Sequence, residues 1–139
     1  MIVVDASGIL SALDAGDPHH RASLEILHRP GPRLLSPLIL AEVDYLLGVR
    51  SGSRVQKVFL SDVTDGAYRL ESFTRDDVIE ARAVLDRYDD LDLGVADASL
   101  VVIAQRHGIH DLFTLDERHF RAVLGPGDVP FRLLPADAD

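Results

Sequence analysis

The sequence predicts an α/β fold, a three-layer α/β/α sandwich around a mainly parallel sheet of about five strands. Short apolar segments rich in β-branched residues alternate along the chain with longer segments of helical periodicity. The chain has 139 residues, of which 47% are hydrophobic, and no internal repeat. This is enough for one buried core and too little for two. We therefore expect residues 1–139 to form a single domain.

The expected strands are short and bounded by polar or turn-forming residues. The first, Ile2–Val4, is a β-branched run that stops at Asp5. Its uninterrupted apolar character is typical of a strand buried on both faces. The other expected strands cover residues 34–35, 68–73, 112–114 and 129–134.

The expected helices have recognisable start and stop residues. Ser36-Pro37 places a capping serine and a first-turn proline before one helix, and Thr74 with Asp77 forms a capping box before another. Gly108 ends the most apolar helix. The expected helical segments are residues 7–13, about 18–29, 37–49, 54–63, 74–88, 94–106 and 116–123.

Composition restricts the possible functions. There are no cysteines, so disulfides and zinc–thiolate sites are excluded. Asp5 follows the first apolar residues too soon for a signal peptide, and the richest apolar window, Leu38–Leu47, contains two acids and is too short for a membrane span. We expect a soluble, cytoplasmic protein. The net charge of −9 favours a basic protein partner, and does not by itself predict nucleic acid.

Four acidic residues stand at positions where chemistry is expected. Asp5 follows the first strand and Asp116 follows the strand at residues 112–114, and the carboxyl ends of parallel strands share one edge of the sheet. Glu42 and Asp97 interrupt apolar helices, where a carboxylate is costly without a partner or a role. Acids gathered in one crevice repel each other unless cations are present, and oxygen-only ligands select magnesium or manganese.

Each acid also has a purely structural interpretation. Asp5 and Asp116 could cap the helices that follow them, and Asp97 could favour the helix dipole. Asp44 competes with Glu42, because both have apolar neighbours on the same helix. Periodicity alone does not choose between them.

Four segments that contain these acids follow one another in a characteristic order along the chain. Together they resemble the PIN-domain family, and in particular the VapC-type toxins, over nearly the whole chain. The resemblance favours Glu42 over Asp44 and implies an acidic site of Asp5, Glu42, Asp97 and Asp116, supported by Ser7 and Thr114. The segments are Val3–Ser7, Ser36-Pro37 leading to Ala41–Leu46, Leu93–Leu100 and Thr114–Phe120.

The resemblance implies metal-assisted hydrolysis of a phosphodiester by an activated water. Asp5 and Asp97 would be direct ligands of Mg²⁺ or Mn²⁺, Glu42 would act through water, and Asp116 would complete a second metal position or orient the water. The implied substrates are structured RNAs such as tRNA or rRNA, cut to leave a 5′-phosphate and a 3′-hydroxyl. The implied partners are a VapB-type antitoxin and a second copy of the chain.

The surfaces that would hold these partners are less clearly marked. Arg118 and Arg121, beside Asp116, are the candidate RNA-binding residues. Arg50, Arg54 and Lys57 are interpreted as a solvated helix face. A groove for an apolar helix of the antitoxin is expected from Ile9, Leu10, Leu13, Leu24, Leu27, Val55, Val58 and Phe59.

Three rival functions are less compatible with the sequence. A haloacid-dehalogenase-like phosphotransferase and a receiver domain also have an aspartate after a strand. The phosphotransferase needs a second aspartate two residues later, where this chain has Ser7. Both need a lysine at a strand end, whereas Lys57, the only lysine, is expected within a helix. A non-catalytic PIN-like scaffold would be expected to have lost an acid. The six histidines have no zinc-binding spacing.

Overall fold

The computed structural model describes all residues from Met1 to Asp139. Five strands form one sheet in the order β3-β2-β1-β4-β5, and every neighbouring pair is parallel. This confirms the predicted sheet. The strands are β1 (Ile2–Val4), β2 (Arg33–Leu35), β3 (Arg69–Leu70), β4 (Asp111–Phe113) and β5 (Arg132–Leu134).

Seven α-helices and two short 3₁₀ turns connect the strands. Their starts follow the predicted caps: the Ser36 hydroxyl accepts from the Leu38 N–H, and Thr74 and Asp77 form the capping box. None of the helices combines the length and apolar character that crossing a membrane requires. The helices are α1 (Ala6–Leu13), α2 (His20–Leu27), α3 (Pro37–Ser51), α4 (Ser53–Thr64), α5 (Arg75–Arg87), α6 (Val95–His107) and α7 (Glu117–Phe120), and the turns are η1 (Asp89–Leu91) and η2 (Pro126–Asp128).

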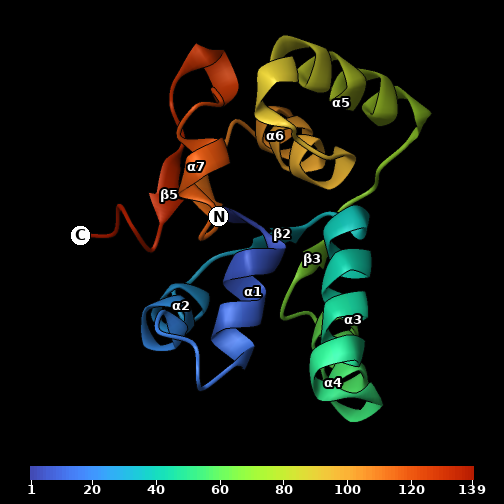
Figure 1. Cartoon of the computed structure of the whole chain (residues 1–139), viewed down its shortest axis with the longest axis vertical. Helices are drawn as coiled ribbons and strands as arrows, with labels where there is room; N and C mark the ends of the chain where they lie inside the picture. The colour runs from blue at the N-terminus through green and yellow to red at the C-terminus, as the bar shows by residue number, and fades with distance from the viewer.

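The sheet order determines the layers. The connections from β1 to β2 and from β2 to β3 run in one direction across the sheet, and those from β3 to β4 and β4 to β5 run in the other. Because crossovers between parallel strands are right-handed, the two directions place their helices on opposite faces. Accordingly α1 to α4 cover one face and α5 to α7 the other, as Figure 1 shows. The predicted three-layer sandwich is confirmed.

The direction of winding reverses between β1 and β4, which lie side by side at the centre of the sheet. The Asp5 N–H donates to the Phe113 carbonyl over 2.9 Å, which holds the ends of these two strands in register. In sheets of this type the ligand crevice lies outside the carboxyl ends of the strands at such a switch point. The fold therefore brings Asp5 and Thr114, the residues after β1 and β4, to the place where a site is expected.

Several elements are shorter than the sequence indicates, among them α2, which covers only His20–Leu27 of the expected residues 18–29. The strand expected at 68–73 has only two paired residues, Arg69 and Leu70, because it lies at the sheet edge and both are exposed. The helix expected to Val123 ends at Phe120, where the Ala122 N–H bonds back only three residues, to His119. The strand expected from residue 129 begins only at Arg132, because η2 ends at Asp128 and Pro130 pairs with Leu124 in an isolated antiparallel bridge.

Candidate active site

Asp5 is the most buried acid of the chain, with 6% of its surface exposed. Its backbone is extended, and its side chain caps α1, since Oδ1 accepts from the Ala6 N–H over 2.8 Å. Its other oxygen, Oδ2, accepts from the Ser7 and Thr114 hydroxyls, each over 2.7 Å. The capping role expected as an alternative is therefore real, but it uses only one of the two oxygens.

Ser7 and Thr114 connect this carboxylate to the segment after β4. The two hydroxyl oxygens lie 3.2 Å apart. Ser7 Oγ accepts from the Leu115 N–H at 2.9 Å, and Thr114 Oγ1 accepts from the Asp116 N–H at 3.0 Å. Because each hydroxyl donates to Asp5 and accepts from the backbone, the orientation of Asp5 is fixed from both sides. The sequence predicted both residues as supports.

Glu42 comes from α3 and Asp97 from the first turn of α6. Asp97 Oδ2 accepts from the Gly94 N–H at 3.0 Å, so it caps its own helix, while Glu42 makes no hydrogen bond and is exposed at the mouth of a cavity. Both carboxylates lie close enough to Asp5 for their charges to interact with its charge. The fold thus brings three of the four predicted acids together from three separate elements.

Desolvation, with a smaller contribution from neighbouring charges, disfavours the ionised form of two of these carboxylates. Burial raises the pKa of Asp5 above its ordinary value; the hydrogen bonds from Thr114, Ser7 and Ala6 oppose the rise, and the Asp97 charge adds to it. Desolvation also raises the pKa of Glu42, with further contributions from the charges of Asp5 and Asp97. These carboxylates are therefore less stable in the charged form than solvated ones, as expected for a site that receives a cation.

Asp116 is joined to this group indirectly, through Thr114. Its Oδ1 accepts from the His119 N–H at 3.1 Å, and its Oδ2 lies 2.7 Å from His119 Nδ1. Its side chain is 33% exposed, so it remains accessible despite these bonds. Asp116 therefore caps α7 and is held by His119, a residue to which the sequence assigned no role.

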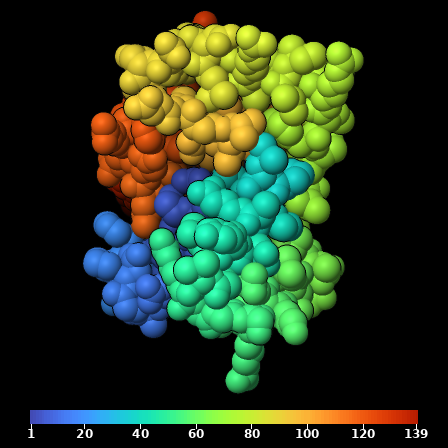
Figure 2. Space-filling model, turned by 45° about the vertical axis from the view of Figure 1, so that its right-hand side comes forward, coloured from blue at the N-terminus to red at the C-terminus, as the bar shows by residue number.

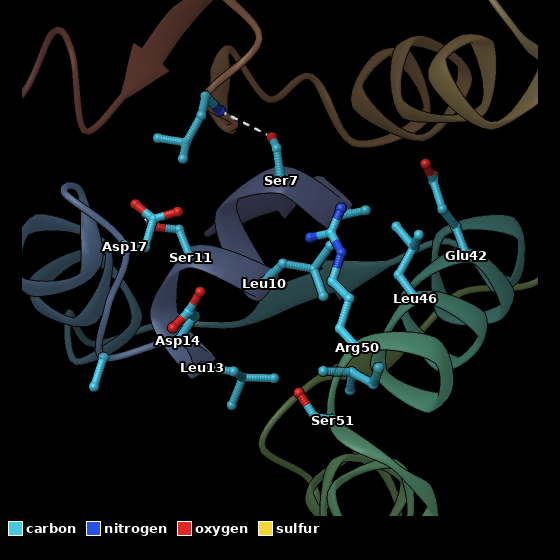
Figure 3. A pocket seen from close by; sticks show the side chains of 14 residues that line it. Ser7, Leu10, Ser11, Leu13, Asp14, Asp17, Glu42, Leu46, Arg50 and Ser51 are labelled. Atoms are coloured by element: carbon cyan, nitrogen blue, oxygen red, sulfur yellow. Dashed lines mark hydrogen bonds between the residues drawn. The ribbon is translucent and has the colours of Figure 1, made fainter.

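A cavity of about 550 Å³ opens beside the acids, between α1 and α3. Figure 2 shows this region as a hollow, with the first residues of the chain (dark blue) visible between α3 (teal) and the orange segments near the C-terminus. In Figure 3, Ser7 and Glu42 lie at one end of the cavity and Asp14 and Leu13 at the other. The cavity continues the acidic crevice into an elongated, partly apolar depression.

The walls of this cavity differ from the predicted groove. Leu10 and Leu13 line it as expected, but the opposite wall is Leu46 and Leu47 of α3. Two other residues of the expected groove belong to the core: Ile9 is fully buried, and Phe59 packs edge-on against Tyr68. The apolar faces of these helices could not be divided between core and groove without their tertiary neighbours.

Basic residues are also placed differently from expectation. Arg121 pairs with Glu117 at 2.8 Å and with Asp137 at 2.7 Å, and Arg118 is exposed without an ion pair; neither lines the cavity. Arg50, interpreted from the sequence as part of a solvated helix face, lines the cavity together with Glu42. The spacing of Glu42, Leu46 and Arg50, four residues apart on one helix, could have signalled this.

The donor set fits a hydrated divalent ion. All side chains at the predicted metal position offer oxygen, the preference of Mg²⁺ and Mn²⁺. No three acidic or histidine side chains are gathered closely enough to hold one ion together, so Asp5, Asp97 and Asp116 do not surround a single point. Magnesium keeps several of its waters and needs only one or two protein carboxylates. The site fits that mode of binding, and it does not fit a dehydrated, all-protein cage.

A parallel sheet wound in this order, with carboxylates at its switch point, is the architecture of the PIN-type nucleases, which are generally metal-dependent. The PIN domain family matches residues 2–124. The chain is 33% identical over 135 residues to the ribonuclease VapC26 of Mycobacterium tuberculosis, covering 96% of this chain and all of that protein. The chain therefore belongs to the PIN-domain family, and within it to the VapC-type ribonuclease toxins.

Solved structures show the same fold. VapC20 of Mycobacterium tuberculosis, described as a toxin that cleaves the sarcin–ricin loop, superposes with a TM-score of 0.77 at 26% identity, over 84% of this chain and 90% of that one. The VapBC2 complex of Rickettsia felis, solved on a promoter DNA fragment, superposes with a TM-score of 0.68 at 15% identity, over 96% of this chain and 98% of the matched chain. The second likeness concerns the fold alone.

Proposed function

We propose that the protein is a Mg²⁺- or Mn²⁺-dependent endoribonuclease that cuts structured RNA, either tRNA or rRNA, as the toxin of a VapBC-type pair. The observation that carries this proposal is the convergence of Asp5, Glu42 and Asp97 at the switch point of the sheet, with the pKa values of Asp5 and Glu42 raised by desolvation and neighbouring charge. Keeping these carboxylates charged against desolvation and neighbouring charge costs stability. This cost is consistent with a site that binds a cation during its function, and it argues against a non-catalytic scaffold.

The residues divide the work as follows. Asp5 and Asp97 would hold the ion, Glu42 would act through water, and Asp116 would orient the attacking water or complete a second ion position. When bound, a divalent ion makes water more acidic and stabilises the negative charge that develops on the phosphate. Ser7 and Thr114 keep Asp5 Oδ2 in place through their 2.7 Å hydrogen bonds. The buried, fixed Asp5 is thus the anchor, and the more exposed Glu42 is free to adjust to substrate.

Cleavage and its metal requirement can be tested in one experiment. The purified protein is incubated with total tRNA and ribosomal RNA in Mg²⁺, in Mn²⁺ and in excess EDTA, and RNA fragments with 5′-phosphate ends are sequenced. We expect cuts at a few sites, present with either ion and absent with EDTA. Undiminished cutting in EDTA would contradict the proposal, because oxygen ligands alone supply no nucleophile.

A VapB-type antitoxin is the proposed partner. Several chains of the same fold were solved as toxin–antitoxin complexes, including one from Klebsiella pneumoniae. The net charge of −9 suits a basic, disordered antitoxin segment that folds on binding. Leu10, Leu13 and Leu46 offer apolar contacts in the cavity beside the acids, where an antitoxin arginine or lysine could compete with the metal. Co-expression with the adjacent small open reading frame should give a complex and restore growth; a toxin that purifies alone while growth stays inhibited would exclude this partner.

We also propose that residues 1–139 act as one PIN domain in each half of a homodimer. Tyr45 and Val49 are both 68% exposed, and they lie one turn apart on α3. Large apolar side chains adjacent on a helix surface are typical of an interface. Light scattering at micromolar concentration, without antitoxin, should give twice the 15.2 kDa mass of the chain. A monomeric mass would refute this part of the proposal.

A further inference from the structure

Arg50 is the only basic residue that lines the cavity beside the acids. It belongs to the last turn of α3, and Figure 3 shows its guanidinium directed into the cavity, toward the end where Ser7 and Glu42 lie. Three acids line the same cavity, yet Arg50 forms no ion pair and no hydrogen bond with any of them. Those acids are Asp14, Asp17 and Glu42.

The free state of Arg50 contrasts with other arginines of the chain. Arg121 is fixed by Glu117 and Asp137, Arg132 by Asp111, and Arg106 by Asp77. A guanidinium that already forms ion pairs with carboxylates has few free N–H donors and little uncompensated charge for binding another anion. Arg50 keeps its full set of donors and its full charge for a ligand.

The position of Arg50 relative to Glu42 defines what it can contact. Glu42, Leu46 and Arg50 follow each other at intervals of four residues, so they form one stripe along α3. Eight residues of α-helix correspond to a rise of about 12 Å. The backbone positions of Glu42 and Arg50 are therefore well separated, and the Arg50 side chain reaches back along the cavity toward the acids.

We propose that Arg50 binds a phosphate of the RNA strand other than the one that is cut, and so anchors the strand in the cavity beside the acids. The inference rests on the proposed ribonuclease function and adds an anchoring residue to it. Guanidinium groups match phosphate oxygens with two parallel hydrogen bonds. The aliphatic part of Arg50 can lie against Leu46 while its charge faces the strand. In a protein of net charge −9, such an anchor offsets the repulsion of RNA.

A binding experiment tests the anchor without cleavage. Asp5→Asn protein in EDTA is titrated with a fluorescent RNA oligonucleotide, taken from a cleavage site, over a range of salt concentrations. Arg50→Gln is compared with Arg82→Gln, which removes the same charge from an exposed arginine of α5 that forms no ion pair. We expect Arg50→Gln to weaken binding on the order of tenfold, and to lower the slope of log K against log salt by about 0.7. Arg82→Gln should change neither quantity.

Kinetics with metal give a second measurement. In the otherwise wild-type protein, Arg50→Gln should raise KM by about the same factor as Kd and leave kcat within about twofold, because the contact is formed equally in the ground and transition states. Arg50→Lys should recover part of the loss, since it restores the charge without the two-pronged geometry. Unchanged circular dichroism and thermal unfolding of the variants would exclude a folding defect.

Several outcomes would overturn the inference. If the parent protein binds and cuts RNA but Arg50→Gln binds it as tightly, the anchor is wrong while the ribonuclease function stands. A loss of kcat at constant KM would also refute it. If Arg50→Gln weakens binding of the antitoxin and not of RNA, the residue is an antitoxin contact instead. If the parent neither binds nor cuts RNA, the proposed function fails together with the anchor.

Discussion

Replacing Asp5 by asparagine and by alanine should separate the structural role of this residue from its chemical one. Asparagine keeps an oxygen for the Ala6 N–H, but its NH₂ group replaces the oxygen that accepts from the Ser7 and Thr114 hydroxyls, so those two hydroxyl protons lose their acceptor. Alanine removes every acceptor that Asp5 offers, leaving three donors at a residue that is 6% exposed. Both changes remove the carboxylate charge, so both should abolish cleavage.

The two variants should differ in stability. Loss of the cap and of the acceptors in Asp5→Ala should cost about 1–3 kcal/mol of unfolding free energy. Asp5→Asn should instead gain about 0.5–2 kcal/mol, a typical result where function had required a strained group. The raised pKa of Asp5 determines how the stability of the wild-type protein changes with pH. Between the unfolded and the folded pKa, the folded state holds the extra proton, so wild-type stability falls as pH rises through this window. The advantage of asparagine is then present at pH 7 and absent below about pH 4.

Urea unfolding followed by circular dichroism, in EDTA at pH 7 and near pH 3.5, measures these differences. We expect Asp5→Asn to unfold at higher urea than wild type at pH 7 and at nearly the same concentration near pH 3.5, with unchanged m-values. An asparagine variant less stable than wild type at pH 7 would refute the reasoning, because it would mean that the hydrogen bonds to the charged carboxylate outweigh desolvation and repulsion.

Three further predictions concern the surroundings of Asp5. Glu42→Gln should abolish or strongly reduce cleavage while Asp44→Asn, on the same helix, keeps it; the reverse pattern in the RNA cleavage assay would show that the choice between the two acids is wrong. His119→Ala should reduce kcat/KM by about 10- to 100-fold at normal stability, because the hydrogen bond that orients Asp116 is lost. His119→Asn should recover part of the lost activity. Equal activity of wild type and His119→Ala would exclude the orienting role. Gly8→Ala should lower Tm, because the new Cβ would lie 2.9 Å from the buried Phe113 ring. This clash should outweigh the helix preference of alanine over glycine, which is about 1 kcal/mol. A Tm at or above that of wild type would show that the ring can move.

Elements with an unambiguous local signal could be predicted from the sequence. β1 is an uninterrupted β-branched run closed by Asp5, and α6 is bounded by Gly94 and Gly108, so their type and limits follow from local chemistry. The parallel order then follows from alternation and handedness. It also explains why the acids after two different strands could be expected at one edge. The prediction of the central site therefore depended on few tertiary assumptions.

The parts that could not be predicted depend on contacts distant in sequence. Asp44 and Glu42 have similar neighbours along the helix, and only the packing of α3 beside α1 directs Glu42 into the cavity. The same packing decides that Phe59 joins the core and that Arg50 faces the cavity. Helix periodicity identifies apolar faces, but it does not say whether another element covers them.

Asp5 shows why a site of this kind conflicts with the stability of the fold that builds it. The residue caps α1 with one oxygen and links β1 to the segment after β4 with the other, so a neutral asparagine could serve either function but not both. The charge is retained at a buried position, next to Asp97, where burial and repulsion both oppose it. The hydrogen bonds account for an acceptor at this position, but they do not account for a full charge where burial and repulsion oppose it. The proposed binding of a cation would account for that charge.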